Sequence, residues 1–87
     1  MARARKIVHI EWVDSATHSG WHNTAHDPRG VAHCQSVGMV VRDNEKEIVI
    51  VQSWSDDETV AKVGESIAIP KAAVRRKRNI ASIQRKP

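Results

Sequence analysis

The sequence contains neither phenylalanine nor tyrosine, and its three aromatic residues are all tryptophan. A hydrophobic core must therefore be built from valine, isoleucine, methionine and tryptophan. Only one cysteine is present, Cys34, which excludes an intrachain disulfide. A domain this small buries only about 60% of the surface that its unfolded chain exposes. Because no disulfide supplements this core, we predict a homo-oligomer.

Long apolar runs are also missing. The basic N-terminus, residues 1–6, is followed by an apolar stretch that His9 and Glu11 interrupt. Neither a signal peptide nor a membrane-spanning segment is therefore predicted, and we expect no membrane partner. A single free cysteine fits a reducing compartment, so we expect a cytoplasmic protein.

Acidic residues are absent from both ends of the chain. All ten of them lie between residues 7 and 70, whereas ten of the fourteen basic residues lie in 1–6 and 71–87. The net charge of +4 thus combines an acidic body with basic ends. This separation predicts a polyanionic partner or charge pairing between subunits.

Apolar and polar residues alternate in several short segments, a period that is typical of β-strands. Strands are expected at 7–13, 34–42, 47–53, 66–69 and 74–78. Residues 48–51 are apolar at every position, which predicts a central strand covered on both faces. Gly38 is expected to mark a bulge or bend in the second strand, and Pro70 a turn before the fifth.

Five strands with a turn between the last two predict an all-β fold, a small SH3-like or Sm-like barrel. A closed barrel would leave no exposed sheet edge. Residues 15–32 are polar and lack a sustained period, which predicts one long loop. We divide the chain into a basic N-terminal arm at 1–6, a single barrel domain at 7–80 and a flexible, basic C-terminal tail at 81–87.

A set of short motifs resembles, in order and spacing, small uncharacterised proteins of tailed bacteriophages and prophages. The motifs are Ile10-Glu11-Trp12-Val13-Asp14-Ser15, Gly20-Trp21, Cys34-Gln35-Ser36-Val37-Gly38, Ile50-Val51-Gln52-Ser53 and Ile67-Ala68-Ile69-Pro70-Lys71. The resemblance covers nearly the whole chain up to Ile80. It implies a viral origin, expression in the cytoplasm of a bacterial host cell and a β-barrel fold, but no activity. The basic run at 75–78 is heavier than this resemblance leads us to expect.

The main candidate site is the basic run Arg75-Arg76-Lys77-Arg78, with Lys71 beside it. Adjacent cations repel one another, so gathering them gives little benefit unless an anion binds there. Lysine and arginine bind phosphate groups, arginine through two parallel hydrogen bonds. The alternatives are a solvated edge strand whose charges prevent aggregation, or a segment that pairs with the acidic body of a neighbouring subunit.

Two tryptophans complete the predicted ligand site. Trp21 in the polar loop and Trp54 at the end of the third strand are placed where a ring can stack on a nucleobase or fill a partner's pocket. Each ring is equally well placed to cover the mouth of the barrel. Trp12 falls on the apolar face of the first strand and is expected in the core.

Histidine and cysteine cluster in and beside the long loop, which makes a zinc site a candidate. The ligands would be drawn from His18, His22, His26, His33 and Cys34. Their spacing fits no familiar zinc module, and Gly20 and Pro28 argue against a helix that would align the first three. We therefore predict no metal and no other cofactor, with a zinc-dependent protein as the weaker alternative.

No nucleophile elbow and no glycine-rich phosphate loop occurs in the sequence, so we predict that the protein is not an enzyme. Adjacent residues of a strand point to opposite faces, and His33 is therefore poorly placed to activate Cys34. The remaining function is a non-enzymatic binding module for a phosphate-bearing ligand. That ligand is either a nucleotide signal of host defence, sequestered between subunits, or RNA or DNA. The alternative is a structural or protein-interaction role, as a virion component or an inhibitor of a host protein.

Overall fold

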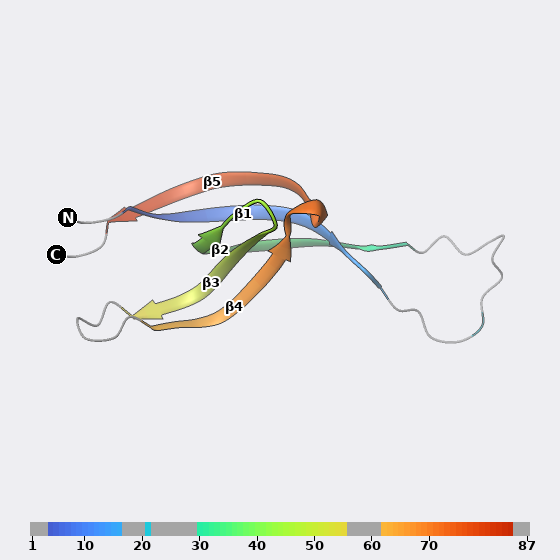
Figure 1. The fold of residues 1–87 in the computed structure, drawn as a ribbon, viewed down its shortest axis with the longest axis horizontal. Helices are drawn as coiled ribbons and strands as arrows, with labels where there is room; N and C mark the ends of the chain where they lie inside the picture. Colours follow the sequence, from blue (N-terminus) through green and yellow to red (C-terminus); the bar gives the residue numbers. More distant parts are fainter. Residues whose placement is uncertain (1–3, 17–20, 22–29, 56–61, 85–87) are drawn as a thin grey trace.

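The computed structural model describes residues 4–16, 21, 30–55 and 62–84 (Figure 1). The elements are β1 (Ala4–Asp14), β2 (Ala32–Asp43), β3 (Glu47–Ser55), β4 (Lys62–Pro70), the 3-10 turn η1 (Lys71–Ala73) and β5 (Val74–Gln84). The predicted all-β fold with a turn between the last two strands is confirmed. The described part of the chain contains no helix with the length and apolar character needed to cross a bilayer.

All strands belong to one five-stranded antiparallel sheet with the order β4-β3-β2-β1-β5. Within the described residues β4 and β5 do not pair with each other, so the sheet keeps two edges and is not a closed barrel. Closure of the barrel is therefore not confirmed. β3 lies inside the sheet, as its continuous apolar run predicts. Its Ile48, Ile50 and Val51 are buried.

The outer strands are longer than the apolar pattern predicts. β1 begins at Ala4 and β5 ends at Gln84, beyond the limits expected at residues 7 and 80. These ends pair with each other, Ala4 opposite Gln84 and Arg5 opposite Ile83. Backbone pairing needs no apolar side chain, which is why alternation alone misses these residues. Residues 81–84 are thus strand, whereas 85–87 of the predicted tail lie outside the described residues.

The core lies between the β1–β2–β5 part of the sheet and the β3–β4 hairpin. Its buried cluster consists of Val8, Ile10, Ile48, Ile50 and Ile69. Fully burying an aliphatic side chain of this size contributes about 1.5–3 kcal/mol. Trp12, at its expected position on β1, is partly buried and packs against the cluster.

The hairpin approaches β2 closely at Gly38. A Cβ atom on this residue would lie 2.7 Å from the backbone oxygen of Val51, so no other residue fits here without a shift. Of the bulge or bend predicted at Gly38, the bulge is not there, because Gly38 pairs regularly with Val8 of β1; the bulge of β2 lies at Val41. Val40 pairs with Ile50 and Arg42 with the neighbouring Val49, so that Val41 is the extra residue.

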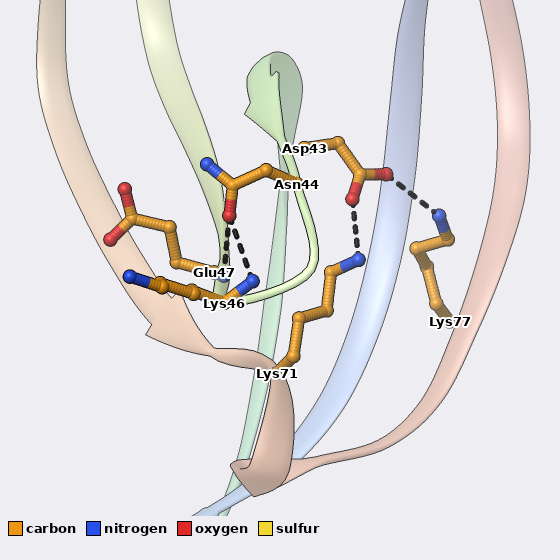
Figure 2. Close-up of polar contacts among 6 residues, drawn as sticks. All are labelled: Asp43, Asn44, Lys46, Glu47, Lys71 and Lys77. Carbon is orange, nitrogen blue, oxygen red and sulfur yellow. Dashed lines mark hydrogen bonds and ion pairs between the residues drawn. The ribbon is translucent and has the colours of Figure 1, made fainter.

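The β2–β3 connection is the turn that residues 43–46 predict. The side-chain Oδ1 of Asn44 accepts hydrogen bonds from the backbone N–H groups of Lys46 and Glu47, both at 2.9 Å (Figure 2). The backbone N–H of Lys71 donates to the carbonyl of Lys46 at 2.9 Å. The tip of this hairpin is thereby tied to η1, which follows Pro70 and leads into β5.

Candidate anion-binding site

The basic run occupies the first half of β5, an edge strand. All four of its residues are exposed, namely Arg75, Arg76, Lys77 and Arg78. Arg76 lies opposite Glu11 of β1 and Arg78 opposite His9, which places both on the sheet face away from the core. Lys77 lies opposite a buried residue of β1 and therefore on the core side. The alternation of the strand thus divides the run between two faces.

Arg75 is the extra residue of a second β-bulge. Glu11 pairs with Arg76, while the next residue of β1, Trp12, pairs with Val74. The guanidinium of Arg75 donates to the carbonyl of Ala72 in η1 at 2.9 Å. Bulges re-aim side chains and are over-represented beside functional sites. This bulge frees Arg75 from the regular alternation of β5.

Lys71 and Lys77 share one carboxylate on the core side of the sheet. Lys71 Nζ lies 2.6 Å from Asp43 Oδ1, and Lys77 Nζ lies 3.2 Å from Oδ2 of the same group (Figure 2). The hydrogen bond from Lys71, with the contribution of Lys77, holds the pKa of Asp43 below its ordinary value of 3.8, against an opposing effect of burial. Both lysines, predicted to bind the ligand, are therefore already engaged with an ionised carboxylate.

Arg78 belongs to a row of polar side chains across three strands. Its Nη2 lies 3.4 Å from His9 Nδ1, and His9 Nε2 lies 2.8 Å from Oε1 of Gln35 on β2. Arginine only donates hydrogen bonds, so Nδ1 of His9 accepts and its Nε2 carries the proton donated to Gln35. The row orients the guanidinium of Arg78 and supplies no negative charge to it.

Arg76 makes no hydrogen bond or ion pair within the part of the chain that the structure describes. Glu11 lies directly across from it on β1, yet the two side chains are not within ion-pair distance. Among residues 4–16, 30–55 and 62–84, none of the three arginines of the run, Arg75 included, pairs with a carboxylate.

Arg75 and Arg76 line a groove of about 340 Å³ formed by β1, β2 and the start of β5. The other lining residues are Glu11, Trp12, Val13, His33, Cys34 and Gln35. The indole Nε1 of Trp12 donates to Ser36 Oγ at 3.0 Å, which fixes its ring. The sequence predicts Trp12 in the core alone, because strand phase reports the face of a side chain and not the groove that it borders. Ligand pockets commonly measure about 300–1,000 Å³.

The tryptophans predicted to stack on the ligand do not line this groove. Trp21 is fully exposed. Trp54 is half-buried near the end of β3, where it lies opposite Val63 of β4. The structure therefore does not place either ring beside Arg75 and Arg76.

Of the candidate zinc ligands, His18, His22 and His26 lie outside the described residues. His33 and Cys34 are consecutive on β2, and the thiol of Cys34 donates to the carbonyl of Ala32 at 3.9 Å. Where the structure is described, no group of three or more His, Cys, Asp or Glu residues is arranged to hold a metal ion.

No protein family, curated protein or solved structure was found that matches the chain.

Proposed function

We propose that the chain is a non-enzymatic binding module for a phosphate-bearing ligand, which is held by the arginines of β5. One observation carries this proposal. Arg75, Arg76 and Arg78 are exposed close together on an edge strand, and in the described ranges none of them contacts a carboxylate. Their mutual repulsion costs free energy that a bound anion would offset. Arginine suits phosphate because its planar guanidinium donates two parallel hydrogen bonds.

The groove beside Arg75 and Arg76 supports a ligand of nucleotide size. A nucleotide signal of host defence is therefore the form that we favour, and RNA or DNA lying along β5 is the other. The two forms share the same phosphate chemistry but differ in salt dependence. For single-stranded nucleic acid each phosphate contact makes the slope of log affinity against log salt concentration more negative by about 0.7, so affinity for a strand held at several phosphates falls steeply with salt.

Glu11 limits how strongly a phosphate binds in this groove. Its carboxylate lines the groove and lies across from Arg76 without neutralising it. A phosphate drawn to Arg76 is therefore repelled by Glu11. Replacing Glu11 by glutamine is expected to tighten binding, which a merely structural pairing of the two residues would not predict.

Calorimetric titration with a cyclic dinucleotide and with a short single-stranded RNA tests the proposal, at about 50 and 200 mM salt. Arg76→Gln is expected to weaken binding by about tenfold to a hundredfold, because hydrogen bonds to charged groups contribute about 1.5–3 kcal/mol. Lys62→Gln is the matched control, since Lys62 at the start of β4 has no ion pair within the described ranges. Absence of binding by both probes at the lower salt concentration, or equal loss in both variants, contradicts the proposal.

We further propose that the sheet is an open relative of the SH3-like or Sm-like barrel, unpaired between β4 and β5 in the described part of these strands, and that the protein acts as a homo-oligomer in the cytoplasm of a phage-infected or lysogenic bacterium. The 3-10 turn between β4 and β5 supports the fold type. The two sheet edges support the oligomer, because uncovered edges favour pairing with another chain. Native mass spectrometry of protein purified from its bacterial host is expected to show an oligomer with ligand that is recovered intact after denaturation. A ligand-free monomer would count against both the oligomer and the bound ligand.

A further inference from the structure

β2 and β3 lie close at Gly38 and separate on its N-terminal side, and the gap leaves two strand edges uncovered in the described part of the chain. The N-terminal half of β2 pairs with β1 alone, and β3 beyond Val51 pairs with β4 alone. In Figure 1 the β3–β4 hairpin leaves the β1–β2–β5 part of the sheet at an angle. An uncovered edge presents backbone N–H and C=O groups to which another extended segment can bond.

A groove of about 390 Å³ lies in this gap. Its lining residues are Gln35, Ser36, Val37, Ile50, Gln52, Glu65, Ser66 and Ile67. Ile50 is buried and Ile67 half-buried, so the groove has an apolar floor beneath a polar rim. Side-chain amides on the rim bond well to peptide backbone, and an apolar floor accepts a side chain. This combination fits an extended polypeptide, whose successive side chains point alternately into and out of such a groove.

Glu65 on the rim has a strained backbone. Its φ of 57° is uncommon for a residue other than glycine. The adjacent Gly64 would adopt such a conformation without strain, yet the strain falls on the residue that lines the groove. Strained residues of this kind cluster at binding sites. In the described ranges the Glu65 carboxylate also has no hydrogen bond or ion pair, which favours a basic group in the ligand.

We propose that this groove binds an extended segment of another protein, which adds as a strand to the uncovered edge of β2 and places a basic side chain at Glu65. Cys34 to Gly38 would pair with about five residues of the segment, at about 3.4 Å per residue. The site is separate from the arginines of β5, although Gln35 borders both grooves. It gives the chain a second binding activity that does not depend on the phosphate ligand.

The probe is a blocked seven-residue peptide in which valine and arginine alternate. We expect it to slow hydrogen exchange of backbone amides in residues 34–38. In an antiparallel pair, only every second residue of a strand exchanges backbone hydrogen bonds with a given neighbour. N-methylation removes a backbone N–H donor. Methylating the peptide at one set of alternate positions should therefore abolish binding, whereas methylating the other set should leave it intact. A contact through charge alone would tolerate both N-methylated peptides, and that result overturns the proposal.

Three variants locate the site. Glu65→Gln is expected to weaken peptide binding about two- to fivefold, the range of an exposed ion pair. Glu45→Gln removes the same charge from the β2–β3 turn and is expected to leave binding unchanged. Arg76→Gln should also leave it unchanged, so this proposal can fail or succeed independently of phosphate binding. An equal loss of peptide affinity in Glu65→Gln and Glu45→Gln overturns the proposal. So does slow hydrogen exchange of residues 34–38 in the protein without peptide, if this protection is lost on dilution. That result would identify a second copy of the chain as the occupant of the groove.

Discussion

Lys77 of β5 lies 3.2 Å from Asp43 at the end of β2, although β1 separates these two strands in the sheet. The contact is on the core side, because Lys77 lies opposite Ile10 of β1. β2 therefore curves around the core, past the bulge at Val41, until its end reaches β5. Lys71 joins the same carboxylate from η1. One acidic side chain thus connects three elements across the open side of the sheet.

Replacing Asp43 by asparagine is expected to lower the free energy of unfolding at neutral pH by about 1 kcal/mol, since both ion pairs are partly exposed. The pKa of Asp43 is lowered in the folded state. The stabilisation by its two ion pairs is therefore complete above the ordinary pKa of 3.8 and is lost as the pH falls through the lower folded-state pKa. Urea unfolding should show the difference from the wild type at neutral pH and its progressive loss as the pH is lowered below the ordinary pKa of Asp43.

Glu45→Gln is the control for this measurement, because Glu45 lies in the adjacent turn and has no ion pair within the described ranges. We expect its effect to stay within about 0.5 kcal/mol at every pH. An Asp43→Asn effect that persists at low pH would show that the carboxylate acts through packing and not through its charge.

Gly38→Ala is expected to destabilise the protein by about 1–3 kcal/mol, the usual effect of inserting a group into a filled space. The new Cβ would lie 2.7 Å from the Val51 oxygen and 3.1 Å from the Ile50 Cβ, and the oxygen belongs to backbone that cannot easily move. Gly64→Ala is the matched control, because its nearest contact, the Ser53 Cβ, is 3.9 Å away. The urea midpoints of the two variants measure the difference. Equal losses of stability would show that β3 does not approach β2 closely at Gly38.

The alternation of apolar and polar side chains predicts the strands and their buried faces, but not the pairing or closure of the sheet. Val8 and Ile10 alternate with polar residues, and their strand and core face are confirmed. The pairing of Ala4 with Gln84 is invisible in the sequence, because backbone hydrogen bonds leave no apolar period. Whether the sheet closes depends on curvature accumulated at bulges, and the extra residue Val41 looks like any other apolar residue of β2.

The sequence identifies the basic residues of the candidate site, but it does not show which of them are already paired with a carboxylate. Four adjacent cations are plain in the sequence, yet Asp43, which neutralises Lys77, lies 34 residues away along the chain. Arg76 and Arg78 share one face because they are two residues apart on β5, but the face that they occupy follows from the pairing with Glu11 and His9 of β1, which the sequence does not show. The sequence therefore predicts an anion site, and only the structure shows that the arginines are available to the anion while the lysines are paired with Asp43.

Asn44→Ala is expected to lower the free energy of unfolding by about 1–2 kcal/mol, since two hydrogen bonds from backbone N–H groups lose their acceptor and each contributes about 0.5–1.5 kcal/mol. Asn44→Asp keeps an acceptor oxygen at the same position and should retain most of the stability. Thermal unfolding of both variants checks the turn. Equal destabilisation by alanine and aspartate would mean that the side-chain amide N–H₂, and not the Oδ1 acceptor, stabilises it.

His9 is expected to carry its proton on Nε2 when it is neutral. Arg78 occupies Nδ1 as a donor, and Gln35 Oε1 requires a donor at Nε2, so both neighbours select the same tautomer. Nitrogen chemical shifts of labelled histidine report this directly, with exposed His33 as the internal control. In Arg78→Ala the preference for Nε2–H should weaken, because only Gln35 then constrains the ring. A wild-type His9 protonated on Nδ1 would place two donors face to face, and Arg78 would not be oriented by β1 at all.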